Sequence, residues 1–412
     1  MLSLRYLTLV LIALSTLSAP AFAAKKHRVD VDYQVRFLPE SGQAAVKIVL
    51  EESAAVVSLQ FDLGSQGYYT DFKGTGTFSE EEDGKLLWIP GDGKGKGSLS
   101  YLVKIDHPRD NGKFDARITP DWALLRGDDL IPSAKLIQQG GTELVSRLQF
   151  ELPSGWASVE TGWPRVGKNQ FRINVASRKL DRPTGWIIAG KIGSRRDQLG
   201  DATVSVAAPI GEGMQRMDIL TMLSFVWPEA EAAFQRQPAK LLIVGANDPM
   251  WRGALSAPNS FFMHAARPVV SENGTSSLVH ELVHVFTRIR DTDNSDWISE
   301  GIAEFYAIEL VRRAGGMTDY RYQAVRSKLQ KWSKSVKTLR GPSSSGPVTA
   351  RAVLLLQELD QEIRKKTDNQ RSLDDVTRGL MRLEKASTKD FIEICENILG
   401  KKSAVLDTRL LR

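Results

Sequence analysis

The chain has 412 residues, of which 42% are hydrophobic and 25% are charged. This length predicts two or three folded units, and this composition excludes a largely disordered chain. The formal net charge is +6, and acidic residues alternate with basic ones almost throughout, so we expect no nucleic-acid partner. The single cysteine, Cys395, excludes a disulfide framework and a cysteine-rich metal site.

Residues 1–23 have the pattern of a signal peptide. Arg5 gives a positive start, residues 7–17 are apolar, and the segment AFA at 21–23 has the small-residue form that signal peptidase cleaves. The apolar run is short for a transmembrane helix, which needs about 20 residues, and no later stretch is long and apolar enough. We therefore expect an exported protein, periplasmic or secreted, with no integral membrane segment after cleavage.

From about residue 28 to 200 the dominant hydrophobic period is two, and the predicted N-terminal domain is 24–202. Val31, Tyr33 and Val35 alternate with polar neighbours, and glycine-rich breaks such as GDGKGKGS at 91–98 separate similar runs. This pattern predicts a β-sandwich-like N-terminal domain whose sheets each have one solvent-exposed face. Several tryptophans fall in this region. They could form a carbohydrate-binding surface, but packing in the core or between domains is the favoured interpretation.

After residue 203 the pattern becomes mostly helical, so the predicted fold class is α+β and multidomain. Short apolar runs at 204–210, 240–246 and 260–265 predict a small sheet. Helical periodicity is found in seven segments, at 213–235, 275–289, 297–314, 319–338, 350–366, 372–385 and 388–399. The stretch RGPSSSGP cannot continue a helix, and we use it to divide this region into subdomains at 203–340 and 341–412.

The sequence HELVH at 280–284 carries the clearest chemistry. His280 and His284 are four residues apart on a predicted helix, so both imidazoles face the same side and can bind one Zn²⁺. Glu281 lies beside the metal without binding it, where it can act as general base towards a water molecule that zinc activates. The motif also occurs by chance on exposed helices, but here the flanking residues are apolar on most of the helix circumference. A buried helix with these polar groups needs polar partners, which favours a metal.

The segment DWISEGIAEFYAIEL is predicted to supply the third ligand. Glu300 and Glu304 stand one turn apart on a mostly apolar helix, where carboxylates need compensation. We assign Glu300 as the third ligand of a subdomain that binds one zinc ion per chain, because catalytic zinc has three protein ligands and one water. Glu304 is expected to accept the outer N–H of a ligating imidazole, although a solvent-exposed carboxylate is nearly as good an interpretation.

HELVH followed by WISEGIAEFY resembles the gluzincins, the thermolysin-like zinc peptidases. Within them the chain is most similar to the glycyl aminopeptidase family, peptidase family M-sixty-one. The similarity to this family is found in the segments LLLQELDQEIRKKTDNQRSLDDVTRGL, ELVRRAGGMTDYRY and GALSAPNSFF, and it covers about 204–400. The resemblance implies a thermolysin-like, mostly helical catalytic domain with a small sheet, zinc held by His280, His284 and Glu300, and a peptide or protein substrate.

The sequence departs from this family in its substrate-handling residues. Ser256 and Ala257 stand where the family has the Glu and His of G-G-x-E-H, and Val348-Thr349 stand where it has a tyrosine thought to polarise the scissile carbonyl. Replacements for that tyrosine could come from the residues Tyr320, Tyr322 and His264, although packing on an amphipathic helix is the favoured interpretation of each tyrosine taken singly. Because Ser256 cannot bind a free ammonium, we expect activity other than that of a strict aminopeptidase.

The predicted function is an exported zinc metallopeptidase with Glu281 as general base. The alternative is a catalytically silent zinc-binding envelope protein that binds a partner through its β domain. Loss of the tyrosine favours this alternative, and retention of Glu281 opposes it. Hydrolysis of a non-peptide amide or ester is also compatible with the same chemistry. The sequence makes no prediction of the oligomeric state.

Overall fold

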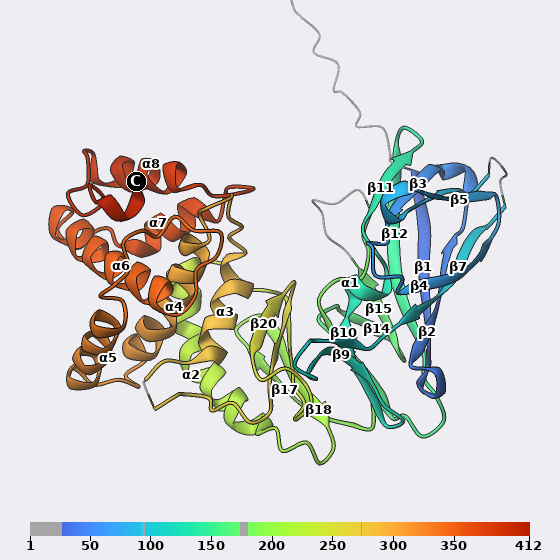
Figure 1. Ribbon diagram of the computed structural model, residues 1–412, viewed down its shortest axis with the longest axis horizontal. Helices are drawn as coiled ribbons and strands as arrows, with labels where there is room; N and C mark the ends of the chain where they lie inside the picture. Colours follow the sequence, from blue (N-terminus) through green and yellow to red (C-terminus); the bar gives the residue numbers. More distant parts are fainter. Residues whose placement is uncertain (1–26, 92, 94, 174–179, 273) are drawn as a thin grey trace, which may run out of the picture.

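The computed structural model describes residues 27–412, apart from residues 92, 94, 174–179 and 273. Figure 1 shows two parts side by side, a β-rich part formed by the N-terminal half of the chain and a helix-rich part formed by the C-terminal half. The predicted signal peptide lies outside the described residues. Every helix in the described ranges is too short or too polar to cross a membrane.

The β-rich part contains three sheets. The seven-stranded sheet has the order β14 (Arg165–Gly167), β15 (Gln170–Ile173), β12 (Thr142–Glu151), β1 (His27–Leu38), β2 (Gln43–Leu50), β7 (Gly97–Lys104) and β4 (Tyr69–Gly74). The five-stranded sheet has the order β13 (Ser158–Thr161), β16 (Trp186–Gly190), β10 (Trp122–Arg126), β9 (Phe114–Ile118) and β8 (His107–Pro108). The four-stranded sheet has the order β11 (Ala134–Gln138), β3 (Val56–Asp62), β6 (Lys85–Ile89) and β5 (Thr77–Glu81).

The alternating pattern of the sequence becomes the inner and outer faces of these sheets. Val31, Tyr33, Val35 and Phe37 of β1 are each at most 2% exposed, whereas the residues between them are partly or fully exposed. Strand β1 pairs antiparallel with β2 on one side and parallel with β12 on the other. The tryptophans of this region, including Trp122 and Trp186, are buried, which supports the packing interpretation over a carbohydrate-binding surface.

A mixed five-stranded sheet lies beside the helices. Its order is β17 (Ile192–Leu199), β18 (Ala202–Pro209), β19 (Lys240–Val244), β21 (Ser260–Met263) and β20 (Ala254–Ala257). Strands β18, β19 and β21 are parallel, and β20 runs antiparallel at one edge. Because β17 pairs with β18 along its whole length, the sheet includes residues on both sides of the predicted division at 203.

The described residues contain eight α-helices, seven of them in the helix-rich part. They are α1 (Gly127–Leu130), α2 (Arg216–Phe234), α3 (Ser277–Thr287), α4 (Trp297–Arg313), α5 (Asp319–Trp332), α6 (Pro347–Lys366), α7 (Leu373–Leu380) and α8 (Thr388–Leu399). Helix α5 ends six residues earlier than predicted, because the following segment turns and the Leu339 N–H donates to the Leu410 carbonyl. Helix α7 also ends early, just after Gly379, a weak helix former.

Apolar clusters hold these layers together. One cluster fills the β-rich part, and another packs α2 to α8 against the mixed sheet from Leu199 to Leu411, so it spans the predicted division at 340–341. A third, smaller cluster joins the two parts, with Trp186 of β16 against Phe262 of β21 at a ring-centroid distance of 5.2 Å. The mixed sheet is therefore fixed on one side by the N-terminal sheets and on the other by the helices.

Candidate metal centre

Helix α3 presents two histidines from an otherwise buried element. It begins where the Ser276 hydroxyl accepts the Val279 N–H at 3.3 Å, and it ends at Arg288 in a left-handed conformation. Leu278, Val279 and Leu282 are fully buried, so the rotation of the helix is fixed by packing. His280 and His284 lie one turn apart and both are partly exposed.

The structure brings His280, His284 and Glu300 together, each with one ligand atom within 4.8 Å of the others. The two Nε2 atoms are 3.2 Å apart, and the Glu300 carboxylate oxygens lie 3.3 Å from His280 Nε2 and 3.4 Å from His284 Nε2. Two ligand atoms at about 2.0–2.1 Å from a tetrahedral zinc ion are separated by about 3.3–3.4 Å. The two Nε2 atoms are close to this separation, and the Glu300 carboxylate reaches both of them, with Oε2 next to His280 and Oε1 next to His284. The donor set of two imidazoles and one carboxylate suits zinc. The site-residue assignments themselves stay predictions.

Glu304 reaches the outer nitrogen of His280. Its Oε2 atom lies 3.0 Å from Nδ1, as expected from the one-turn spacing between Glu300 and Glu304. With a metal ion at Nε2, the remaining imidazole proton would stay on Nδ1, where this carboxylate accepts it. The contact therefore fixes both the tautomer and the orientation of the ring.

The charges of the cluster are strongly coupled. Burial lowers the pKa of His280, but hydrogen bonds to the Glu300 and Glu304 carboxylates outweigh it and raise that pKa to about 10. Burial raises the pKa of Glu300, but hydrogen bonds to the two histidines dominate and hold it well below its usual range. The carboxylate therefore stays ionised, which is the form that binds a metal cation.

Glu281 follows His280 directly on α3, and its side chain is 8% exposed. Its negative charge also raises the pKa of His280, so its carboxylate lies within electrostatic range of the cluster. This position allows proton transfer to or from a group held at the three donor atoms.

Residues that were not predicted from the sequence fix the first turn of α4. Asp291 accepts hydrogen bonds from the Ser299 N–H at 3.3 Å and from the Ser299 hydroxyl, and burial raises the pKa of Asp291 to about 6. Asp296 accepts the Ser344 N–H at 2.6 Å. These contacts hold the turn that carries Glu300. Asp296 could have been noticed as an acid just before a helix, but the contacts of Asp291 and Ser344 have no local sequence signal.

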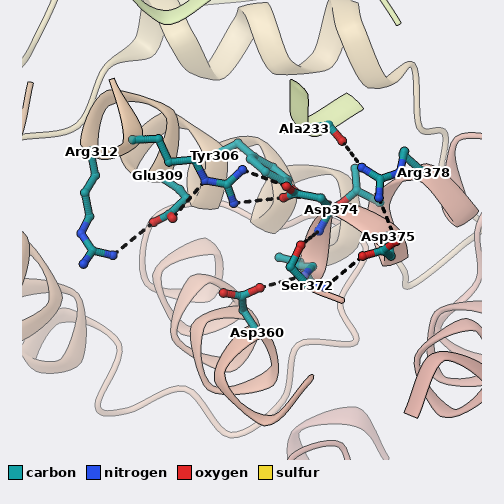
Figure 2. A network of polar contacts seen from close by, with 12 residues as sticks. Ala233, Tyr306, Glu309, Arg312, Asp360, Ser372, Asp374, Asp375 and Arg378 are labelled. Atoms are coloured by element: carbon teal, nitrogen blue, oxygen red, sulfur yellow. Dashed lines mark hydrogen bonds and ion pairs between the residues drawn. The ribbon is translucent and has the colours of Figure 1, made fainter. Parts of the chain in front are cut away.

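A second set of contacts anchors the other end of α4, as Figure 2 shows. The Tyr306 hydroxyl donates to Asp374 Oδ1 at 2.7 Å, and Arg313 forms a bidentate pair with the same carboxylate at 2.9 and 3.0 Å. Asp374 belongs to the first turn of α7, in the segment RSLDDV singled out from the sequence. That segment therefore supports the helix that carries Glu300 and Glu304.

The structure does not place the two candidate tyrosines beside the cluster. Tyr320 is 87% exposed, at the start of α5. Tyr322 packs its ring against the Arg312 guanidinium at 4.4 Å. Arg312 is twelve residues after Glu300 on α4, about 18 Å along the helix axis, so Tyr322 lies beside the far end of α4. The expectation that one of them assists the site is not supported by this geometry.

The remaining predicted residues belong to the mixed sheet. Ser256 lies on the edge strand β20, paired with Phe261 of β21. His264 follows β21 and is 1% exposed; its Nδ1 accepts the Ala266 N–H at 3.2 Å, and its Nε2 lies 3.7 Å from Asp248 Oδ1. Burial lowers the pKa of His264. Among the described residues, no hydrogen bond or ion pair joins either side chain to the three ligand candidates.

The sequence matches no known family description and no curated protein, but solved structures share its fold. An aminopeptidase N family protein from Idiomarina loihiensis is 14% identical with a TM-score of 0.65, covering 91% of this chain and 76% of that one. A mutant M1 zinc metallopeptidase from Deinococcus radiodurans, bound to a Tyr-Ser-Ala substrate, is 14% identical with a TM-score of 0.59 and covers 93% of both chains. A two-domain M1 zinc metallopeptidase mutant bound to L-arginine is 15% identical with a TM-score of 0.57, covering 91% of both chains. The chain therefore has the architecture of two-domain M1 peptidases.

Proposed function

We propose that this protein is a zinc-dependent metallopeptidase of the gluzincin type, with one zinc ion held by His280, His284 and Glu300. The observation that carries the proposal is the cluster of donor groups next to the buried carboxylate of Glu281. The two Nε2 atoms of this cluster are 3.2 Å apart, and the Glu300 carboxylate oxygens lie 3.3 Å from one of them and 3.4 Å from the other. The shared fold with zinc metallopeptidases supports it. The closer resemblance to the glycyl aminopeptidase family rests on the sequence segments alone.

The proposed reaction is hydrolysis of a peptide bond. Zinc, when bound, would polarise the peptide carbonyl and lower the pKa of a water molecule. Glu281 accepts a proton as water attacks the carbonyl carbon and passes it to the departing amine as the C–N bond breaks. Glu300 and the two imidazoles would hold the zinc ion, and so fix the position of the reacting groups. Glu304 accepts the Nδ1 proton of His280, which keeps Nε2 available to the metal.

The test combines a chelator with a single substitution. Wild-type protein should hydrolyse members of a mixed peptide library, and the chelator should stop it. Glu281→Gln should keep its zinc but lose about 10²–10⁴-fold in rate, because the amide has the shape of the carboxylate without its basicity. Glu384→Gln, an exposed acid on the surface, is the matched control and should be unchanged. Equal rates for wild type and Glu281→Gln would refute the mechanism.

The silent zinc-binding protein remains the second candidate, because neither Tyr320 nor Tyr322 is placed beside the cluster. A protein of this kind would bind zinc through the same three residues and recognise a partner through its β-rich part. Full zinc occupancy without hydrolysis of any peptide, amide or ester tested would establish it over the enzyme.

We also propose that peptide cleavage is not confined to free N-termini. Ser256 and Ala257 offer no carboxylate to a substrate ammonium. Glu272 and Asp248 are the acids that could take over this task. Asp248 is already paired with Arg252 and with Lys113, the latter at 2.6 Å, and these contacts lower its pKa. Comparable cleavage of a free and an N-acetylated form of one peptide would support this, and cleavage of the free form alone would contradict it. We also propose that the protein acts outside the cytoplasm, because residues 1–23 have the pattern of a signal peptide.

A further inference from the structure

One stretch of the chain breaks the expected alternation of charges. Between Asp319 and Glu358 the sequence contains eight Lys and Arg residues and no Asp or Glu. The whole chain has a net charge of only +6, so all other residues together sum to 6 − 8 = −2. The expectation of evenly interleaved charges is therefore wrong here, and the positive charge is concentrated on α5 and the segment after it.

These cations lie on the surface. Lys328 and Lys331 of α5, and Lys334, Lys337 and Arg340 of the following segment, are all exposed and recur every third residue. Among the described residues, no ion pair involves Lys331, Lys334 or Lys337. Cations that are exposed and have no acidic neighbour along the chain produce a positive potential that extends into solvent.

Two aromatic side chains accompany these cations. Tyr320 is 87% exposed and Trp332 is 59% exposed, although rings of this size are usually mostly buried. At about 100° per residue, Tyr320, Lys331, Lys328, Arg321 and Trp332 fall within one arc of about 120° on α5. The buried residues of the helix lie outside this arc. Helix α5 therefore turns one basic and aromatic side towards solvent.

The position of α5 leaves this side accessible. Figure 1 shows α5 at the outer margin of the helix-rich part, on the side away from the N-terminal sheets. The segment after α5 is joined to the C-terminus, where the Leu339 N–H donates to the Leu410 carbonyl at 2.9 Å.

We propose that the basic and aromatic side of α5, together with the exposed cations of the segment after it, docks on a membrane surface rich in anionic phospholipids. The residues are Tyr320, Arg321, Lys328, Lys331 and Trp332 of α5 and Lys334, Lys337 and Arg340 of the following segment. Lysine and arginine are attracted to such a surface additively, and amphipathic Trp and Tyr rings settle at the level of the lipid headgroups. A soluble acidic partner would explain the cations but would not need the two exposed rings. The proposal is independent of the peptidase function, since it uses no residue of the candidate metal centre.

The experiment measures binding of the whole protein to vesicles by flotation. Wild type should bind vesicles of 30% phosphatidylglycerol in phosphatidylcholine, bind pure phosphatidylcholine vesicles far less, and be released by high salt. The triple variant Lys331→Gln, Lys334→Gln, Lys337→Gln should lose about 100-fold in partitioning, from roughly fivefold for each lysine. The matched control is Lys47→Gln, Lys73→Gln, Lys135→Gln, which removes three exposed lysines from the N-terminal sheets and should bind as wild type.

Further outcomes separate the lipid surface from other polyanions. Trp332→Ala should weaken vesicle binding several-fold while leaving binding to polyglutamate unchanged, because the ring inserts among headgroups and has no such role towards an acidic polypeptide. Equal loss in both triple variants would overturn the proposal, as would equal binding to neutral and anionic vesicles. Tighter binding to a soluble polyanion than to vesicles, with Trp332→Ala without effect on vesicles, would also overturn it. Unchanged zinc content and melting temperature show that the variants are folded.

Discussion

Two groups of charged side chains lie on opposite sides of the mixed sheet, a partly exposed one around His280 and one around the buried Glu160. Glu160 of β13 is 1% exposed and faces three cations, namely Arg165 at 3.3 Å, Lys240 at 4.0 Å, and Arg196. The His280 group instead contains two imidazoles and the carboxylates of Glu300 and Glu304, and among the described residues no ion pair joins these carboxylates to Lys or Arg. The negative charge of Glu160 is balanced by Lys and Arg side chains of the protein. In the part of the chain that the structure describes, the His280 group has no such Lys or Arg partner, and its side chains are imidazoles and carboxylates, the kinds of group that bind a metal cation.

The difference separates a structural cluster from a functional one. The Glu160 cluster connects the N-terminal sheets with β17 and β19, since Arg196 lies on β17 and Lys240 on β19. Lys240 also donates to the Trp163 carbonyl at 2.9 Å, which adds to the same junction. Substitutions in this cluster should therefore change stability, and substitutions in the His280 group should change metal binding first.

The largest expected effect is on zinc affinity. Glu300→Ala removes one of three ligands and should weaken zinc binding more than about 100-fold, because even loss of an outer partner costs about 10–100-fold. Glu304→Gln keeps all three ligands and should fall within that smaller range. Zinc competition titration with a chelating dye measures both. Equal zinc affinity in Glu300→Ala and wild type would remove Glu300 from the ligand set.

The next effect concerns stability. Glu160→Gln leaves Lys240 buried beside two guanidinium groups without an anion, and should lower the free energy of unfolding by about 2–3 kcal/mol. The value is below the full cost for a buried pair because Arg196 is half-exposed and can turn to solvent. Denaturant unfolding measures it, with zinc affinity expected to stay unchanged. A loss of zinc affinity without a loss of stability would instead assign the Glu160 cluster to metal binding.

Lys240 should give the same junction a pH dependence. Burial lowers the pKa of Lys240 from 10.5 to about 8, although Glu160 opposes the shift. Between pH 8 and 10 the unfolded chain therefore binds more protons at this residue than the folded one, and stability from this group rises with pH. We expect a rise of about 1–2 kcal/mol that Lys240→Met abolishes. Parallel stability curves for both proteins over this range would contradict it.

The smallest expected effect is at the exposed tyrosine. Because Tyr320 is directed into solvent, Tyr320→Phe should leave peptide hydrolysis within about twofold of wild type. Removal of a donor that stabilises the transition state would instead cost about 10²–10³-fold. Steady-state kinetics on one peptide distinguish the two results, and a large loss would return Tyr320 to the site.

Local spacing was enough to predict the arrangement of the candidate site. The four-residue separation of His280 and His284 and the one-turn separation of Glu300 and Glu304 each lie within a single helix, where geometry follows from sequence. Contacts between distant segments were not predictable in this way. The pairing of Ser344 with Asp296, and the packing of Tyr322 on Arg312, depend on how α4, α5 and α6 assemble.

The limits of strands and helices were likewise predictable only where the local sequence determines them. Apolar strands such as β19 were recognisable because their residues are all buried. Strand β17 was missed because its central residues are polar and mostly exposed, so its sequence shows neither alternation nor an apolar run. Helix α6 begins three residues before the predicted start, at Pro347, whose fixed φ suits the first turn of a helix.

The parallel pairing of β1 with β12 has a consequence for how the chain acquires its fold. His27 pairs with Thr142 and Arg36 with Glu151, so the central strand of the largest sheet meets its second neighbour only after more than a hundred intervening residues. Closing so long a loop costs entropy before any contact is gained, and folds rich in such contacts form slowly. Strand β1 therefore has one side unprotected during synthesis until β12 has been made, and the N-terminal part can complete its core only as a whole.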